Sequence, residues 1–190
     1  MSESRTSQKK KPAVNAEDAG GRHRGREVAL QVLYAIDLRE TGARVAAASR
    51  AAKPFDPLLP ESELPAVPVD AAPVDPIAAS GLAFDRVTEN FDVPKSASDF
   101  ARMLVVGVAG RGEVLDELVG QHSRNWRVSR MAAVDRNVLR LGAFELRDTE
   151  TPVAIVIDEA VDLARRFGSD TSPAFVNGIL DAVAKEVRGG

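Results

Sequence analysis

The placement of proline limits what this chain can fold into more than any other feature. Eight of the eleven prolines lie between Pro54 and Pro94, interleaved with alanine and acidic residues. Because a proline inside a helix removes a backbone hydrogen bond and clashes with the preceding turn, this spacing excludes a continuous helix. We therefore predict a mostly disordered insertion at about residues 43–96 and a disordered basic tail at residues 1–20. Residues 21–190 are otherwise predicted to form one domain with a single core.

Outside the insertion, apolar residues recur with the period of an α-helix, and no strand pattern of comparable length is present. The helical spacing covers residues 25–40, 98–118, 130–147, 151–168 and 172–187. Glycines at positions 107 and 110 are expected to permit a close helix contact or a break. Thr151 can cap a helix, and Gly168 fits its end. The sequence predicts an all-α bundle of roughly five to seven helices.

Composition excludes several classes of protein. With no cysteine and only two histidines, the chain cannot form a disulfide, a thiolate metal site or a histidine cluster for zinc. No apolar run approaches the ~18 residues that a membrane span needs, and no signal peptide is recognisable. We therefore expect a cytoplasmic protein with no membrane partner.

The chain also lacks the motifs of common enzymes, such as a phosphate-binding loop or a metalloprotease helix. Asp158 and Asp162 share one helix face and could mimic a catalytic carboxylate pair. Arg165 and Arg166 follow within a turn, so we interpret that face as exposed and charge-paired. We expect no enzyme activity and no cofactor.

Positive charge gathers near the N-terminus although the net charge is −3. This basic segment ends with Arg22, Arg24 and Arg26, at the start of the helix predicted for residues 25–40. Cations there oppose the helix dipole by about 0.3–1 kcal/mol each. Such a placement favours a partner other than the helix, and we expect that partner to be phosphate.

A second basic cluster, "SRNWRVSRMAAVDRNVLR", surrounds Trp126 with arginines. Arginine binds phosphate, and aromatic rings stack on unpaired bases, so the cluster points to single-stranded RNA. Arginine clusters also occur on ordinary solvated surfaces, and tryptophan is often a core residue. The residues alone leave these interpretations open.

Four segments, in the same order, resemble the NusB family of bacterial transcription antitermination factors. They are "FARMLVVGVAGRGEVLDELV", "VDRNVLRLGAFEL", "PVAIVIDEAVDLARRFG" and "FVNGILDAV". The earlier "RGREVALQVLYAIDL" resembles the first helix of that family and its arginine-rich start. The long proline-rich insertion departs from the family pattern and puts the second helix of the N-terminal subdomain in doubt. The resemblance implies an all-α fold of two small helical subdomains.

The resemblance also implies a function. NusB-like proteins bind single-stranded boxA RNA of ribosomal RNA leaders together with the ribosomal protein NusE. This pair joins NusA, NusG and RNA polymerase in an antitermination complex. We therefore expect an RNA-binding transcription antitermination factor that is not an enzyme.

Carried over by motif, the arginine-rich start predicts that Arg22, Arg24 and Arg26 bind RNA phosphates. The tyrosine of the first helix corresponds to Tyr34. It is predicted to stack on a base or to form a hydrogen bond with one, and the alternative is a core tyrosine.

Three later residues complete the predicted RNA site. Phe175 lies at the N-terminal turn of its helix, where backbone N–H groups attract phosphate and the ring can reach a base. Asp135 and Arg140 match positions on the RNA and partner face of the family. They could equally pair with each other across their helix.

Two other classes of protein stay open. One is a helical protein-interaction module that lacks RNA binding. The other is a stand-alone relative of the NusB-like domain of RNA cytosine methyltransferases. The chain ends at Gly190, soon after the last predicted helix, so we expect no catalytic domain. Both a monomer and a homodimer are compatible with the sequence.

Overall fold

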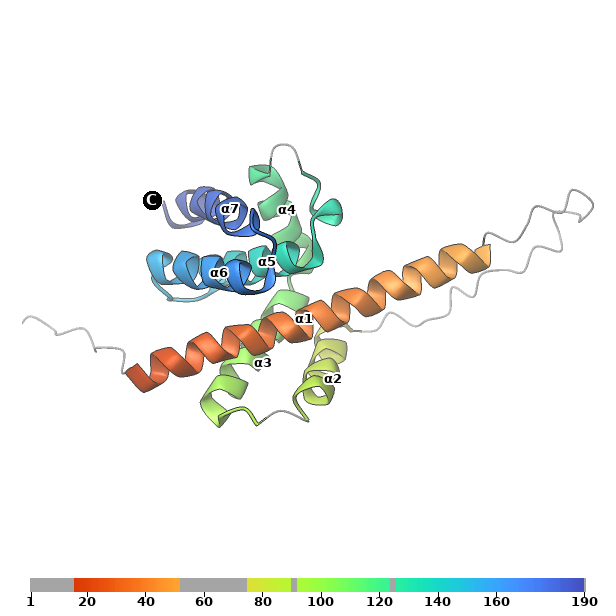
Figure 1. Ribbon diagram of the computed structural model, residues 1–190, viewed down its shortest axis with the longest axis horizontal. Helices are drawn as coiled ribbons and strands as arrows, with labels where there is room; N and C mark the ends of the chain where they lie inside the picture. Colours follow the sequence, from red (N-terminus) through yellow and green to blue (C-terminus); the bar gives the residue numbers. More distant parts are fainter. Residues whose placement is uncertain (1–15, 52–74, 90–91, 124–125, 190) are drawn as a thin grey trace, which may run out of the picture.

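The computed structural model describes residues 16–51, 75–89, 92–123 and 126–189, and it describes the side chains of the first range from residue 20 to residue 39. Within these ranges the chain forms helices and no strand (Figure 1). The elements are α1 (Ala16–Ala51), α2 (Pro76–Thr88), α3 (Lys95–Ala109), α4 (Gly112–His122), a 3₁₀ turn η2 (Val128–Arg130), α5 (Ala133–Asp148), α6 (Val153–Phe167) and α7 (Ser172–Arg188). The predicted all-α class is confirmed.

Two groups of helices share one core. Helices α1, α2 and α3 pack on one another, as do α5, α6 and α7. Helix α4 packs on α5 and α7, and α5 also contacts α1 and α3 (Figure 1). From Asn137 to Leu146, every residue of α5 except Arg140 is buried, because neighbours cover this helix on all sides. Buried apolar residues of both groups form one cluster. The fold therefore consists of two small helical subdomains joined through α5.

Helix α1 is longer than the helix predicted for residues 25–40. It begins at Ala16, inside the predicted tail, and ends at Ala51, inside the predicted insertion. Both predicted boundaries are wrong because no proline interrupts the chain between Pro12 and Pro54. Its buried residues include Val28 and Val32, which belong to the core.

Helix α2 lies inside the segment predicted to be disordered. The Asp75 side chain caps it by accepting a hydrogen bond from the Ile77 N–H at 3.0 Å, and Pro76 occupies its first turn. At that position proline costs no helical hydrogen bond, and Phe84 anchors the helix in the core. The prediction of an insertion across residues 43–96 is therefore wrong for α2. Residues 52–74 lie outside the described residues, and their predicted disorder stays a prediction.

The glycines that follow α2 have both of their predicted roles. A side chain at Gly107 would overlap the ring of Phe144, so this glycine lets α3 approach α5 closely. Gly110 ends α3 and separates it from α4. The single helix predicted for residues 98–118 is therefore two helices.

The last three helices have distinct contacts at their ends, including hydrogen bonds from α7 to the end of α5. Gly168 ends α6 as predicted, but Thr151 is buried and does not cap its start. Arg188 donates hydrogen bonds to four carbonyl oxygens at and after the end of α5, where a helix leaves carbonyl groups in need of partners. The acceptors are Glu145 at 3.0 Å, Leu146 at 2.5 Å, Thr151 at 3.1 Å, and Thr149. In the part of the chain that the structure describes, no helix is long and apolar enough to cross a membrane.

Candidate nucleic-acid interface

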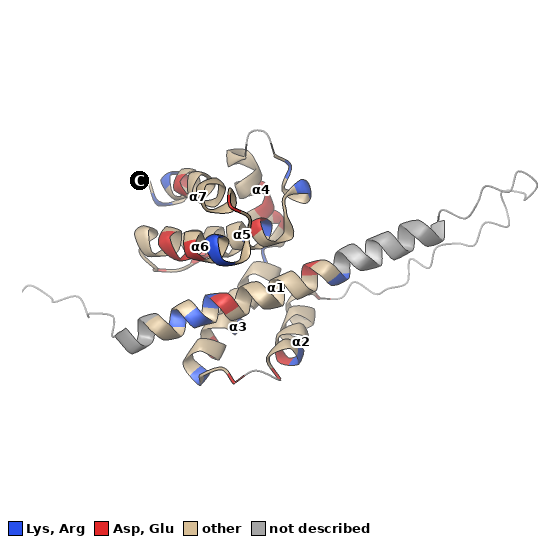
Figure 2. Cartoon of the chain, in the orientation of Figure 1, with Lys and Arg blue, Asp and Glu red and all other residues tan. Residues whose placement is uncertain are grey.

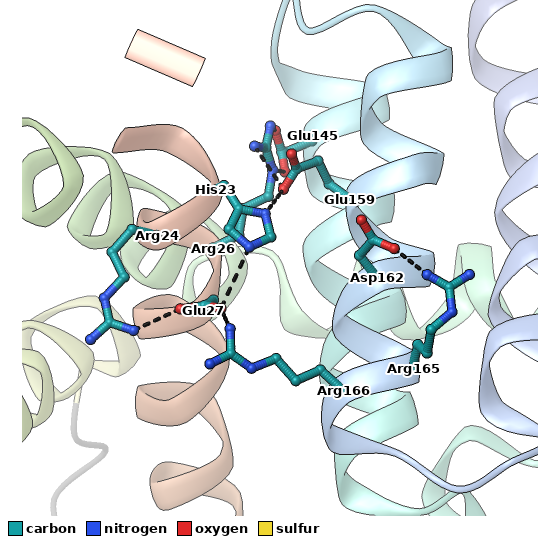
Figure 3. Close-up of polar contacts among 9 residues, drawn as sticks. All are labelled: His23, Arg24, Arg26, Glu27, Glu145, Glu159, Asp162, Arg165 and Arg166. Carbon is teal, nitrogen blue, oxygen red and sulfur yellow. Dashed lines mark hydrogen bonds and ion pairs between the residues drawn. The ribbon is translucent and has the colours of Figure 1, made fainter. Parts of the chain in front are cut away.

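The arginines predicted to bind phosphate lie within α1 and not at its start. The helix begins at Ala16, so Arg22, Arg24 and Arg26 lie beyond the first turn, where the dipole effect has faded. Basic and acidic residues lie close together along this part of α1 (Figure 2). Phosphate is not needed to explain all of these arginines, because Arg24 donates to Glu27 of α1, Arg26 donates to Glu145 of α5, and Arg26 also forms an ion pair with Glu159 of α6 (Figure 3).

Arg26 is a structural residue of the interior. Its side chain is only 3% exposed, and its Nε and Nη2 atoms donate to the two carboxylate oxygens of Glu145 at 2.8 and 2.7 Å. Its guanidinium also lies 5.2 Å from the centre of the Phe100 ring and 3.5 Å from Glu159. Such a two-pronged pair uses the donors that phosphate would need. The prediction that Arg26 holds phosphate is wrong.

The Glu27 carboxylate pairs with arginines of two helices. This carboxylate is 3% exposed and accepts a hydrogen bond from Arg24 Nη1 at 2.7 Å, while Arg166 of α6 binds its other oxygen (Figure 3). His23 lies 3.5 Å from the same carboxylate and 2.8 Å from Glu159. The side chains of Arg24 and Arg166 stay 42% and 59% exposed. One glutamate is therefore shared by two arginines whose side chains both reach the surface.

Sequence spacing misses the role of Arg166, because it assigns this residue to a charge-paired face of its own helix. Only Arg165 behaves in that way, by pairing with Asp162 (Figure 3). Arg166 crosses instead to Glu27 of α1. Helical spacing indicates neighbours on one helix only, so it could not identify this contact.

Arg22 is exposed, and its guanidinium lies 5.4 Å from the centre of the Phe100 ring. The ring therefore has cations of two consecutive turns of α1 over it, Arg22 at the surface and Arg26 in the interior. Arg22 stays a candidate phosphate contact.

Tyr34 belongs to the surface and not to the core, since it is 38% exposed. It follows Glu27 by seven residues, or two turns, so both lie on the same face of α1. One turn later, Asp37 pairs with Arg136 of α5, which also donates to the carbonyl oxygens of Val128 and Met131 at 3.3 and 3.0 Å. These bonds tie the Tyr34 region of α1 to the loop that precedes α5.

Two aromatic rings, those of Phe175 and Trp126, belong to the candidate interface. Phe175 lies half-buried in the first turn of α7, as predicted. Trp126 is 59% exposed and meets Phe175 edge to face, with ring centroids 6.3 Å apart and planes at 69°. Trp126 is therefore not a core residue, which settles an alternative that the sequence left open.

Asp135 and Arg140 do not pair with each other. Arg140 donates from Nε and Nη2 to the carboxylate of Asp116 on α4, at 2.6 and 2.7 Å. Asp135 lies in the first turn of α5, where a negative charge is favourable. Its Oδ1 atom is buried and accepts no hydrogen bond from the residues that the structure describes. The interpretation of a mutual ion pair is wrong.

Cations and rings thus come from helices that side-chain contacts join. Arg24 of α1 and Arg166 of α6 share Glu27, and a short link leads from the end of α6 to the first turn of α7 with Phe175. Tyr34 lies on α1, two turns after Glu27. In the described ranges, no group of three or more His, Cys, Asp or Glu side chains is placed to hold a metal ion. Phosphate-binding cations beside rings suit an unpaired nucleic-acid strand.

Comparison with known proteins shows which family the chain resembles. A model described as the NusB family matches residues 75–185. The "Transcription antitermination protein NusB" of Sorangium cellulosum is 39% identical over 170 residues, which cover 88% of this chain and 94% of that protein. T. maritima NusB superposes with a TM-score of 0.62 at 28% identity, covering 87% of this chain and 91% of that one. A crystal structure of the antitermination factors NusB and NusE in complex with dsRNA has a TM-score of 0.61 at 26% identity, with coverage of 88% and 98%.

Proposed function

The chain belongs to the NusB family, and we propose that it binds single-stranded boxA RNA together with the ribosomal protein NusE as a transcription antitermination factor. The pair would act with NusA, NusG and RNA polymerase in the cytoplasm to resist termination. In this proposal the chain recognises RNA and transforms no substrate.

One observation carries the proposal, namely the surface arginines of α1 and α6, of which Arg24 and Arg166 share Glu27, together with the rings on α1 and in the first turn of α7. Arg22, Arg24 and Arg166 supply cations for phosphates. Tyr34 and Phe175 supply rings for bases. Asp135 is kept as a candidate acceptor for a base N–H.

Two predicted residues are left out of the proposed contacts. Arg26 uses its donors on Glu145 in the interior. Arg140 is held by Asp116 with two hydrogen bonds. A variant that removes all three N-terminal arginines would therefore confuse folding with binding.

The test is a fluorescence anisotropy titration of a labelled boxA oligoribonucleotide with the protein, alone and in complex with NusE. We expect the boxA strand to bind more tightly than a scrambled strand. A boxA duplex serves as a further competitor, because the related NusB and NusE complex contains dsRNA. Affinity for all sequences alike, or for none, would contradict the proposal.

The arginine contribution is tested with Arg22→Ala combined with Arg24→Ala. For each phosphate of the single strand that is no longer neutralised, the slope of log K against log salt should become shallower by about 0.7. Far-UV circular dichroism should show the helices intact, since both side chains reach the surface. An unchanged slope and affinity would reject a role for these two arginines in RNA binding.

The same titrations separate the alternative classes. Binding of NusE with no affinity for boxA RNA, alone or in the complex, would favour a protein-interaction module. Sedimentation of the free protein and of the complex would distinguish a monomer from a homodimer.

A further inference from the structure

Trp126 leaves more ring surface in water than the fold requires. It is the only tryptophan of the chain and is 59% exposed. A tryptophan side chain carries the largest apolar area of any residue, and an exposed one commonly marks a place where a partner binds. The contacts around it indicate which partner.

The described residues on either side of the ring are hydrogen-bonded to their surroundings. The Trp126 backbone N–H donates to the Ser123 carbonyl oxygen at 2.9 Å, and the Ser123 hydroxyl donates back to the Trp126 carbonyl oxygen at 2.8 Å. Ser123 itself is only 7% exposed. On the far side of the loop, Arg136 holds the carbonyl oxygens of Val128 and Met131. A ring on a loop that is fixed before binding loses little conformational entropy when a partner covers it.

The cations beside the ring point to nucleic acid. Arg127 and Arg130 are both exposed, and neither forms an ion pair with any residue in the described ranges. This sets them apart from Arg24 and Arg166, which share Glu27. Exposed guanidiniums next to an exposed indole match the alternation of phosphate and base along a single strand. A purely apolar protein surface would leave both charges without a partner.

The ring also adjoins the proposed RNA site, because it contacts Phe175, a ring of that site, edge to face. We propose that Trp126 stacks on an RNA base beyond Phe175, and that Arg127 and Arg130 bind the neighbouring phosphates. This inference rests on the proposed RNA binding and extends the same site by one aromatic contact.

Because the chain has one tryptophan, its emission reports on this residue alone. We expect a single-stranded boxA oligoribonucleotide to quench the tryptophan emission of the full chain in complex with NusE. The midpoint should coincide with that of the anisotropy titration of the same labelled RNA. NusE and the RNA are added in separate steps, so that the emission change of each is measured by itself.

Variants of Trp126 test how much its ring contributes to RNA affinity. Trp126→Ala should weaken RNA binding about tenfold, within the range expected for one stacked base, whereas Trp126→Phe should keep most of the affinity. Leu82→Ala is the matched control, because Leu82 of α2 is a large apolar residue of similar exposure, at 62%. It should leave RNA affinity unchanged. Circular dichroism checks that each variant keeps its helices.

The outcomes are distinct. RNA binding by anisotropy with unchanged emission, and with Trp126→Ala equal to wild type, would overturn this inference while the proposed function stands. A change in emission on adding NusE but none on adding RNA would overturn it in favour of a protein contact. No RNA binding by the wild-type complex would reject the proposed function, and this inference with it.

Discussion

Two arginine and glutamate clusters lie next to each other on α1, and they differ in what surrounds them. In the first, Arg26 and Glu145 are 3% and 2% exposed and satisfy each other with two hydrogen bonds. In the second, the buried Glu27 is shared by Arg24 and Arg166, whose side chains remain largely in solvent. The same residue types thus hold the interior together at one point and present charge to a partner at the other. Positive charge in a sequence marks a binding site only where the guanidinium reaches the surface.

The largest effect is expected from breaking the interior cluster. Arg26→Ala leaves the Glu145 carboxylate buried without its partner, which should cost about 3–5 kcal/mol of unfolding free energy. Urea unfolding followed by circular dichroism measures it. A loss below that of an ordinary surface substitution would show that the pair is not the interior contact that the structure describes.

The double variant Arg26→Met with Glu145→Leu sharpens this result. It removes both charges together and replaces them with apolar groups, so most of the stability should return. If the double variant is as unstable as Arg26→Ala, packing around Phe100 and not the charge pair determines the cost.

The next effect is expected from removing the aromatic rings of Phe175 and Tyr34. Phe175→Ala should weaken boxA binding by about 1–3 kcal/mol, the range for one stacked base. Tyr34→Phe and Tyr34→Ala distinguish the two roles proposed for Tyr34, because only the first keeps a ring. Equal affinities for wild type and Tyr34→Ala would remove Tyr34 from the site.

A smaller effect is expected from the surface cations. Arg24→Ala with Arg166→Ala should lower RNA affinity about tenfold, or about 1.4 kcal/mol, at low salt. The difference should shrink as salt rises, because screening weakens exposed charges. Isothermal titration at several salt concentrations measures both.

Arg102→Ala is the matched control for that pair. Arg102 is an exposed arginine of α3 that pairs with Asp85 of α2, in the other part of the surface. Its removal deletes one positive charge without touching the proposed face. A loss of RNA affinity equal to that of the double variant would mean that net charge, and not position, drives binding.

The smallest effect is expected at Arg140, which lies between the two cases in burial. Its side chain is 21% exposed and pairs with Asp116, which is 33% exposed. Arg140→Ala should lower unfolding free energy by about 1 kcal/mol, near the upper end for exposed pairs, and leave RNA affinity unchanged. A double-mutant cycle with Asp116→Ala measures the pair, and weaker RNA binding would return Arg140 to the site.

The sequence determined the helical class and most of the helix positions. Apolar spacing predicted the positions of α5, α6 and α7, because the helical period depends on residues that are close together in the chain. Proline was informative where it broke a helix interior, but the same residue at Pro76 starts α2. Local rules could not separate these cases, since a proline is compatible with the first turn of a helix and with a disordered segment alike.

For the site, the sequence indicated arginines and rings but not their exposure. Arg24 and Arg26 are two residues apart, and the sequence predicts the same role for both. Arg26 is nevertheless interior, because it pairs with Glu145, which lies 119 residues later in the chain. Arg166 reaches Glu27 across 139 residues, and Trp126 meets Phe175 only because α7 returns beside the loop before α5. Helix period and capping depend on neighbours in the chain, whereas burial and charge pairing depend on which helices meet in space. Only the tertiary structure could therefore decide which cations and rings face outward.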